Sequence, residues 1–192
     1  MSRPRILSAL RDLMPLRPLT QAEALRLAEL QANRLLTLTD TDTGPVPDGV
    51  ISELPGVEVL YDDSASAPSS GLFRWEKGRY LIVIDATERP LGRQRFSLAH
   101  EFKHVLDYPF VTTLYPALPG MTSKERQEQV CEFFAACLLM PRSWVKRAWC
   151  NERVQQPSRL SNRFGVSTAA MQVRLSTLGL LEQQRRCLVA AR

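Results

Sequence analysis

Apolar residues recur at spacings of three and four over residues 20 to 36, in the stretch "TQAEALRLAELQANRLL". This period predicts an amphipathic helix that buries one face. Thr20 is placed to cap its first turn, and Glu23, three residues later, completes a capping box. Residues 39 to 49 are dense in Thr, Asp, Pro and Gly, which predicts a loop.

The pattern then changes to three short runs of β-prone residues. They are "VEVLYD" at 57 to 62, "GLFRW" at 71 to 75 and "RYLIVID" at 79 to 85. Only "EKG" separates the last two, which predicts a hairpin. We therefore expect a small, mostly antiparallel sheet.

A helix is predicted next, through "RQRFSLAHEFKHVLD" at residues 93 to 107. Pro90 suits its first turn, and the helix must stop before Pro109. Residues 109 to 121 contain three prolines and predict irregular structure.

A second long helix is predicted over residues 123 to 140. Thr122 and Glu125 form another capping box, and Pro141 ends the pattern. Strands followed by helices indicate an α+β fold.

The C-terminal part predicts two short helices joined by the turn "GVS". Apolar residues lie four apart on either side of this turn, and Ser167 is a natural N-cap for the second helix. These pairs are Leu160 with Phe164, and Met171 with Leu175. The arrangement is a helix-turn-helix pattern, so we divide the chain into a domain of residues 1–145 and a helical module of residues 146–192.

Two uses of this module remain open. On DNA, its second helix would offer Thr168, Gln172 and Arg174 to the major groove. Alternatively, the two helices bury their Met and Leu side chains against the rest of the protein, because a helix-turn-helix pattern alone proves no DNA contact. Residues 141–192 hold 10 Lys/Arg against 2 Asp/Glu, about +8, whereas residues 1–140 hold 15 against 18, about −3. Such a basic tail is compatible with an acidic partner such as DNA.

Composition restricts the class of protein. With 44% hydrophobic and 23% charged residues, the chain has no apolar run near the roughly 18 residues of a membrane span. The N-terminal residues show no export signal. The four cysteines, Cys131, Cys137, Cys150 and Cys187, form no CxxC pair, so reduced thiols in a cytoplasm are expected.

The candidate chemistry lies in "AHEFKH", residues 99 to 104, which holds both histidines of the chain. On a helix, His100 and His104 share one face and can bind one cation, with Glu101 turned beside it. This is the HExxH arrangement, in which the cation acidifies a water and the carboxylate takes the proton. The alternative is an ordinary pair of histidines on a solvated face.

A third protein ligand must come from elsewhere in the chain. The predicted helix over 123 to 140 carries Glu125, Glu128 and Glu132 on one stripe. By itself this stripe is more typical of a solvated acidic face near a helix N-terminus, and only the HExxH motif favours a ligand. Cys131 is a further candidate, although a helical cysteine is more typically a small core residue.

Two motifs together make the sequence resemble the ImmA/IrrE metallo-endopeptidases. They are "RQRFSLAHEFKH" (93 to 104) and "EQVCEFFAACLLMP" (128 to 141), which are similar to the family patterns R-F-x-x-A-H-E-x-x-H and E-x-x-A-N-x-F-A-x-x-L-L-M-P. A leading helix and a hairpin before the metal helix agree over most of residues 20 to 180. The resemblance implies a zincin-like metallopeptidase domain.

The resemblance also implies roles for individual residues. His100 and His104 would be metal ligands, Glu128 the third ligand, and Glu101 the general base. Glu132 would orient a ligand histidine. The chain departs from the family at Lys103 and Cys131, where small residues are usual, and at Glu132, where Asn or Asp is usual. Lys103 is expected to alter only the surface.

The function that follows is a zinc endopeptidase, with Mn²⁺ as a possible substitute. By resemblance, its substrate is a cytoplasmic helix-turn-helix repressor. We expect the unpaired edge of the "RYLIVID" strand to hold an extended substrate, and Tyr108 or Tyr115 is a candidate oxyanion donor. The alternative is a DNA- or protein-binding regulator whose metal site is structural or vestigial, closed by Cys131 or Glu132 as a fourth ligand.

Overall fold

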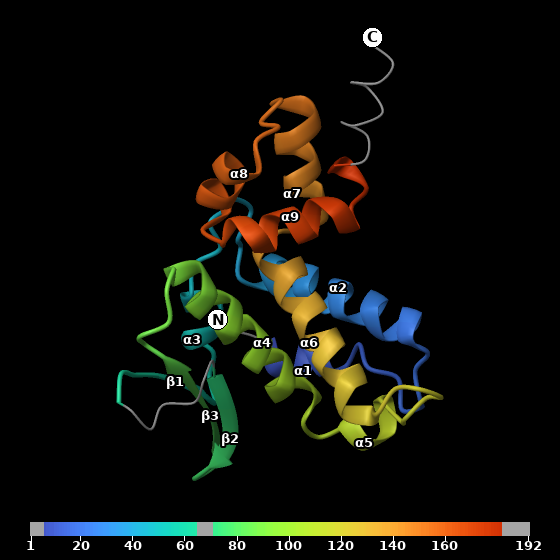
Figure 1. Ribbon diagram of the computed structural model, residues 1–192. Helices are drawn as coiled ribbons and strands as arrows, with labels where there is room; N and C mark the ends of the chain where they lie inside the picture. Colours follow the sequence, from blue (N-terminus) through green and yellow to red (C-terminus); the bar gives the residue numbers. More distant parts are fainter. Residues whose placement is uncertain (1–5, 65–70, 182–192) are drawn as a thin grey trace.

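The computed structural model describes residues 6–64 and 71–181 (Figure 1). A small sheet lies to one side of three long helices, and the C-terminal helices pack above them. The fold is mixed α+β, as the sequence predicted. Within the described residues, no helix is long and apolar enough to cross a membrane.

The sheet has the order β1-β3-β2, formed by β1 (Val57–Asp62), β2 (Gly71–Glu76) and β3 (Arg79–Asp85). The predicted β2–β3 hairpin is confirmed, and both residues of its turn, Lys77 and Gly78, have positive φ, as a tight turn of this kind requires. The prediction of a mostly antiparallel sheet is wrong for the other pair, because β1 and β3 run parallel.

This strand order also corrects the expected substrate edge. β3 lies between its two neighbours, so both of its edges are hydrogen-bonded and none is open to a peptide. Five of its seven residues are buried, which is typical of a central strand. The outer edge of β2 pairs with no other strand of the described residues.

Three helices form the core beside the sheet. They are α2 (Gln21–Leu38), α4 (Leu91–Asp107) and α6 (Ser123–Leu139), and α6 packs against both others. Both predicted capping boxes are present, at Thr20 of α2 and Thr122 of α6. The sequence pattern did not predict the short helices α1 (Ile6–Arg11), α3 (Gly49–Ser52) and α5 (Val111–Leu114).

The C-terminal helices are α7 (Arg142–Lys146), continued by the π-helical turn η1 (Arg147–Asn151), then α8 (Pro157–Phe164) and α9 (Thr168–Thr177). Gly165 closes α8 in a left-handed conformation, φ 63°, and Ser167 caps α9 by accepting from the Ala170 amide. The apolar residues predicted on either side of this turn are all buried: Leu160, Phe164, Met171 and Leu175.

The α8–α9 pair is fastened to the N-terminal end of α4. The guanidinium of Arg95 donates to the carbonyls of Gly165 (3.0 Å) and Val46 and to the Asp48 carboxylate (3.1 Å). Gly92 lies so close to the turn that a Cβ there would be 2.8 Å from the Val166 backbone. The α8–α9 pair is therefore packed on the helix that carries the HExxH motif.

Arg174 of α9 is also part of this packing. It is 3% exposed, its Nε donates to the Met140 carbonyl (3.0 Å), and its guanidinium lies over the Phe133 ring (5.8 Å). Arg174 is therefore not free to contact a DNA groove, contrary to that expectation. The other two residues considered for DNA, Gln172 and Thr168, are both exposed, and the Thr168 hydroxyl lies 3.1 Å from the Ser161 hydroxyl.

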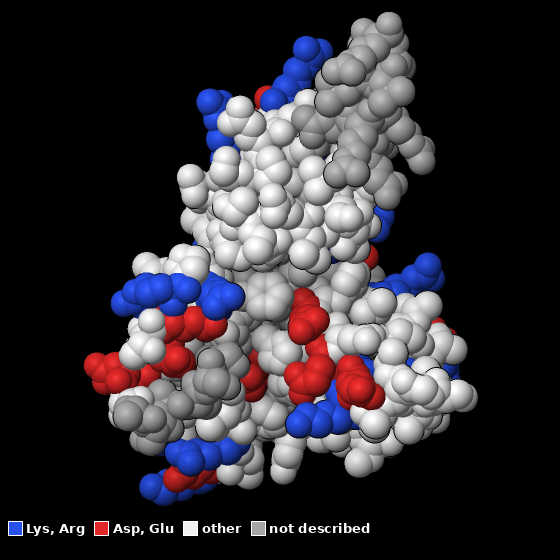
Figure 2. All heavy atoms as spheres, in the orientation of Figure 1, with Lys and Arg blue, Asp and Glu red and all other residues white. Residues whose placement is uncertain are grey.

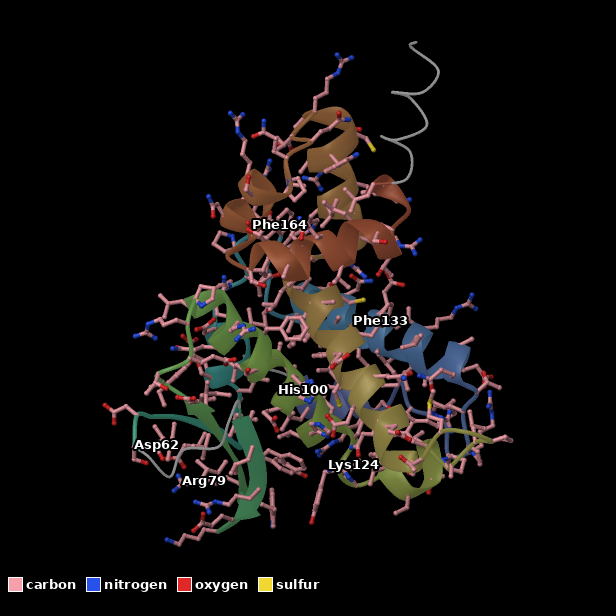
Figure 3. All side chains as sticks on the ribbon, in the orientation of Figure 1. Asp62, Arg79, His100, Lys124, Phe133 and Phe164 are labelled. Carbon is pink, nitrogen blue, oxygen red and sulfur yellow. The ribbon has the colours of Figure 1, made fainter. Side chains whose placement is uncertain are left out.

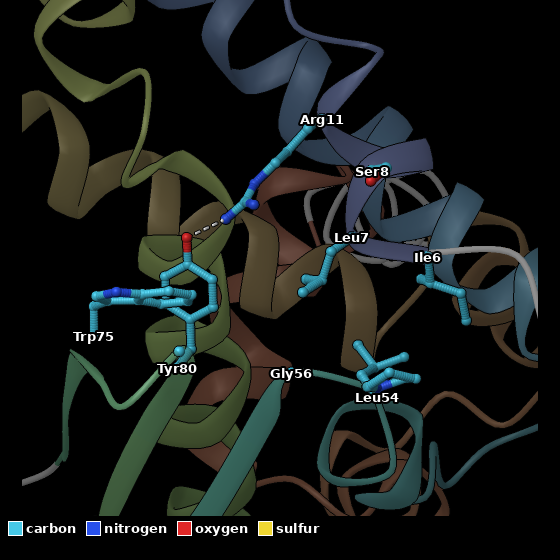
Figure 4. Close-up of a pocket in the computed structure, with 10 residues that line it drawn as sticks. Ile6, Leu7, Ser8, Arg11, Leu54, Gly56, Trp75 and Tyr80 are labelled. Atoms are coloured by element: carbon cyan, nitrogen blue, oxygen red, sulfur yellow. Dashed lines mark hydrogen bonds between the residues drawn. The ribbon is translucent and has the colours of Figure 1, made fainter.

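The C-terminal end of α4 is held by Arg11 of α1. Its guanidinium donates to the Val105 carbonyl (2.7 Å) and the Leu106 carbonyl (3.2 Å). It also donates to the Tyr80 hydroxyl (3.0 Å), as Figure 4 shows. The last carbonyls of a helix lack partners within the helix, so a cation there is stabilising. The same arginine lines a cavity of about 290 Å³ between α1 and the sheet. Both ends of α4 are thus fixed by arginines.

Candidate metal centre

Helix α4 brings the two histidines together. Its uninterrupted helical turns place His100 and His104 on one face, with their Nε2 atoms 3.1 Å apart. The rings are tilted by 60°, with centroids 4.9 Å apart. Two ring nitrogens converging in this way can share one cation.

Glu128 of α6 completes the constellation from the facing helix. Its Oε2 lies 3.2 Å from His100 Nε2 and 3.7 Å from His104 Nε2. Ligand atoms about 2.1 Å from a tetrahedral zinc lie about 3.4 Å from one another. The three separations of 3.1, 3.2 and 3.7 Å bracket that value. The donor set therefore fits a tetrahedral cation, with room for a fourth ligand.

Cys131 is another donor beside the site. Its Sγ and a ring nitrogen of each histidine all lie within 4.8 Å of one another. The side chain is fully buried, and burial raises the pKa of its thiol, so the weakly ligating protonated form is favoured. The Glu128 oxygen lies at ligand-like distances from both histidine nitrogens, which favours Glu128 over Cys131 as the third ligand.

Glu101, the residue after His100 on α4, is buried, with 8% exposed. Burial, and then the negative charge of Glu128, raise the pKa of the Glu101 carboxyl to about 7. A carboxylate with a pKa in this range is suited to taking and returning a proton at neutral pH. The start of β2 lies directly against it: a Cβ on Gly71 would be 2.9 Å from Glu101 Cγ.

His104 is covered by the edge strand. The Phe73 ring of β2 stacks on it, with centroids 5.7 Å apart and planes 9° apart, and Tyr108 meets Phe73 edge-on. Burial, and next the neighbouring His100, lower the pKa of His104. The neutral imidazole is the form that binds a metal.

Glu132 is one turn beyond Glu128 on α6, but it is exposed and makes no hydrogen bond within the described residues. It lines a groove toward α9, together with Phe133 and Arg174. Its role in orienting a ligand histidine stays a prediction that no contact yet supports.

Helix α4 also carries a buried polar cluster that the sequence pattern did not reveal. Lys103, expected at the surface, is fully buried and donates to Asp107 (2.5 Å) and Gln31 (2.8 Å). Tyr115 is also fully buried and donates to Asp107 (2.8 Å), so it cannot serve as an oxyanion donor. The i,i+4 spacing of Lys103 and Asp107 was the available signal. Tyr108, 51% exposed beside Phe73, remains a candidate.

Comparisons with known proteins agree with this geometry. Residues 53–176 match the model of the peptidase family described as IrrE N-terminal-like domain. Over 124 residues the chain is 29% identical to the radiation response metalloprotease IrrE of Deinococcus radiodurans, covering 60% of this chain and 34% of that protein. The chain therefore spans about a third of this relative.

A solved structure shares the fold. The chain superposes on a Mycobacterium tuberculosis transcriptional regulator with a TM-score of 0.62 and 21% identity, over 90% of this chain and 52% of that one. The family match covers more than half of the chain and includes both helices of the metal centre. The chain belongs to the IrrE N-terminal-like domain family, that is, to the ImmA/IrrE metallopeptidases.

Proposed function

We propose that this protein is a metal-dependent endopeptidase that cuts a regulatory protein. The observation that carries the proposal is the convergence of His100, His104 and Glu128 on one point, with the buried Glu101 beside them. Two neutral imidazoles and one carboxylate suit zinc, and manganese is compatible with the same donors.

A bound divalent cation would acidify water and polarise the scissile carbonyl. The protein's own part is the proton transfer. Glu101 accepts a proton from the attacking water and returns it to the leaving amine, and its raised pKa suits both steps. Phe73 covers His104 and helps to exclude water from the ring face. Arginines hold both ends of α4, the helix that carries His100, Glu101 and His104.

The edge of β2 is the surface we assign to the substrate backbone. It pairs with β3 on one side only within the described residues, and it begins against Glu101. An extended peptide can add to such an edge by main-chain hydrogen bonds. Gly71, at the start of the strand, lets the edge approach Glu101 closely.

The substrate class rests on the family resemblance. We infer a cytoplasmic helix-turn-helix repressor, whose cleavage would relieve repression. The printed name of the Deinococcus relative, a radiation response metalloprotease, is consistent with a role in stress. DNA binding by the basic residues of the C-terminal module stays a separate hypothesis, which a gel shift at several salt concentrations tests.

The direct test uses Glu101→Gln. The purified protein, loaded with zinc or manganese, is incubated with a repressor encoded beside its gene, and fragments are identified by mass spectrometry. Glu101→Gln should retain the metal and lose cleavage by at least about 100-fold. Glu53→Gln, an exposed glutamate on α3's C-terminal side, is the matched control and should cut normally. Unchanged cleavage by Glu101→Gln would refute the assignment.

A second candidate function is a binding regulator with a closed, structural metal site. The observation that favours it is Cys131, whose Sγ is within reach of both histidines. A closed site needs four protein ligands, whereas a catalytic site keeps one position open. If Cys131→Ala loses the metal and the parent protein binds the repressor without cutting it, this reading replaces the peptidase.

A further inference from the structure

A groove between α6 and α9 continues the metal centre by one helical turn. Phe96 precedes His100 by four residues on α4, and Glu132 follows Glu128 by four residues on α6. Residues four apart share a helix face, so these two side chains extend the facing stripes that carry the ligands. Both line the groove, which has a volume of about 450 Å³. We call this the α6–α9 groove.

The lining of the α6–α9 groove is mostly apolar. Its apolar residues come from α2, α4, α6 and α9 and from Met140 at the end of α6. They include Phe96, Phe133, Ala136, Met140, Ala170 and Val173. Val173 is 67% exposed at the groove's rim. In Figure 3, Phe133 is labelled between His100 and the C-terminal helices. Binding of a bulky apolar side chain in this groove would be favourable, because it would transfer the side chain from water to an apolar surface.

Two polar groups mark the groove as a place for a polypeptide rather than a purely apolar ligand. Arg174 is 97% buried and lines the groove, and its Nη2 has no hydrogen-bond partner within the described residues. A buried donor without a partner is costly, and a peptide carbonyl would satisfy it. Glu132 is exposed, has no hydrogen-bond partner among residues 6–64 and 71–181, and can accept a peptide N–H. Figure 2 shows acidic side chains over α4 and α6, below a largely uncharged surface.

A second cavity extends the same surface. It has a volume of about 320 Å³, and it shares Phe96 and Ala170 with the α6–α9 groove. Gly92 and Ser167 lie on its far side, at the contact of α4 with α9. The hollow along α9 is thus long enough for more than one residue of a peptide.

We propose that the α6–α9 groove is a substrate subsite, which takes a bulky apolar side chain of the peptide while Arg174 donates to a peptide carbonyl. This inference rests on the proposed peptidase function and adds to it a part of the substrate's recognition. It also gives α9 a role in the site, because Ala170, Val173 and Arg174 form one wall of the groove.

The test is a binding selection that needs no cleavage. Full-length Glu101→Gln protein, loaded with zinc, is immobilised and incubated with a pool of decapeptides. Each peptide has a proline at one fixed position, and all its other positions are randomised. Bound peptides are then sequenced. Leu, Phe and Met should be enriched over Ser by roughly tenfold or more at one position, the preference expected for burying one such side chain.

Ala170→Phe fills the groove and should abolish that enrichment. Gln172→Phe adds the same side chain to an exposed position of the same helix and should leave it unchanged. Val173→Asp, at the exposed rim, is a second disabling variant that does not depend on repacking the core. Arg174→Lys keeps a cation near Met140 and should weaken binding of the whole pool without changing the preference.

The inference is overturned if the Glu101→Gln protein does not enrich apolar residues at any peptide position. It is also overturned if the folded Ala170→Phe and Val173→Asp variants both retain that enrichment. The outcome is separable from that of the proposed function. If apolar residues are enriched but the protein cuts no repressor, the proposed peptidase function is contradicted and the groove's binding preference is still supported. Cleavage without this enrichment contradicts only the groove.

Discussion

Replacing Lys103 with methionine removes the positive charge from the buried polar cluster that Lys103 forms with Asp107 on α4. The Lys103 ammonium lies 2.5 Å from Asp107, 2.8 Å from Gln31 and 3.4 Å from the Tyr115 hydroxyl, and all four side chains are fully buried. Methionine has a similar length and no charge, so the variant leaves the Asp107 carboxylate without its counter-charge. Tyr115 continues to donate to it.

The expected loss of stability is large. Removing one partner of a buried ion pair typically lowers the free energy of unfolding by about 3–5 kcal/mol, because the remaining charge is buried without compensation. For a protein of this size, each kcal/mol shifts the midpoint of thermal unfolding by about 2–4 °C, so a decrease of roughly 6–20 °C is expected. The whole stability of such a domain is only about 5–15 kcal/mol.

Urea and thermal unfolding followed by circular dichroism measure this loss. Lys124→Met is the control, since Lys124 is exposed on α6, and it should change stability by less than about 0.5 kcal/mol. Adding Asp107→Asn to Lys103→Met should recover part of the loss, because the orphaned charge is then removed. Equal unfolding midpoints for Lys103→Met and Lys124→Met would refute the buried-pair reasoning.

Three further predictions concern the site and its supports. Gly71→Ala places a Cβ 2.9 Å from Glu101 Cγ, so it should reduce peptide cleavage while the zinc content stays unchanged. Leu72→Ala, at the exposed neighbouring position, is the control, and an equal loss of cleavage in this variant would contradict the prediction. Arg95→Met removes hydrogen bonds to Gly165 and Asp48 and should lower the free energy of unfolding by about 3 kcal/mol in urea titrations. Chelation with EDTA should lower the thermal midpoint of the parent protein, since a metal that binds only the folded state stabilises it, and an unchanged midpoint would argue against a bound metal.

Local signals predicted much of the fold. The capping boxes at Thr20 and Thr122 appear where the sequence placed them, because each depends on residues only three positions apart. The turn between α8 and α9 could likewise be predicted from Gly165 and Ser167. Within the metal centre, the convergence of His100 and His104 follows from helical periodicity alone.

The features that sequence could not supply depend on distant partners. Periodicity cannot tell which strand lies in the middle of a sheet, so the insertion of β3 between β1 and β2 was missed. Lys103 is buried because Asp107, Gln31 and Tyr115 surround it, and two of these three come from other segments. Arg174 likewise has its hydrogen bond to Met140, 34 residues away. From sequence alone, a charged residue in a helix is predicted to be exposed unless such partners are known.

The position of Glu128 against the two histidines is the central claim, and metal stoichiometry tests it most directly. Mass spectrometry of the native protein and elemental analysis should find one zinc or manganese per chain in the parent. Glu128→Ala should lose it, whereas Glu132→Ala, one turn further on α6, should keep it. Full metal content in Glu128→Ala together with its loss in Cys131→Ala would contradict the account, because the third ligand would then be the buried thiol.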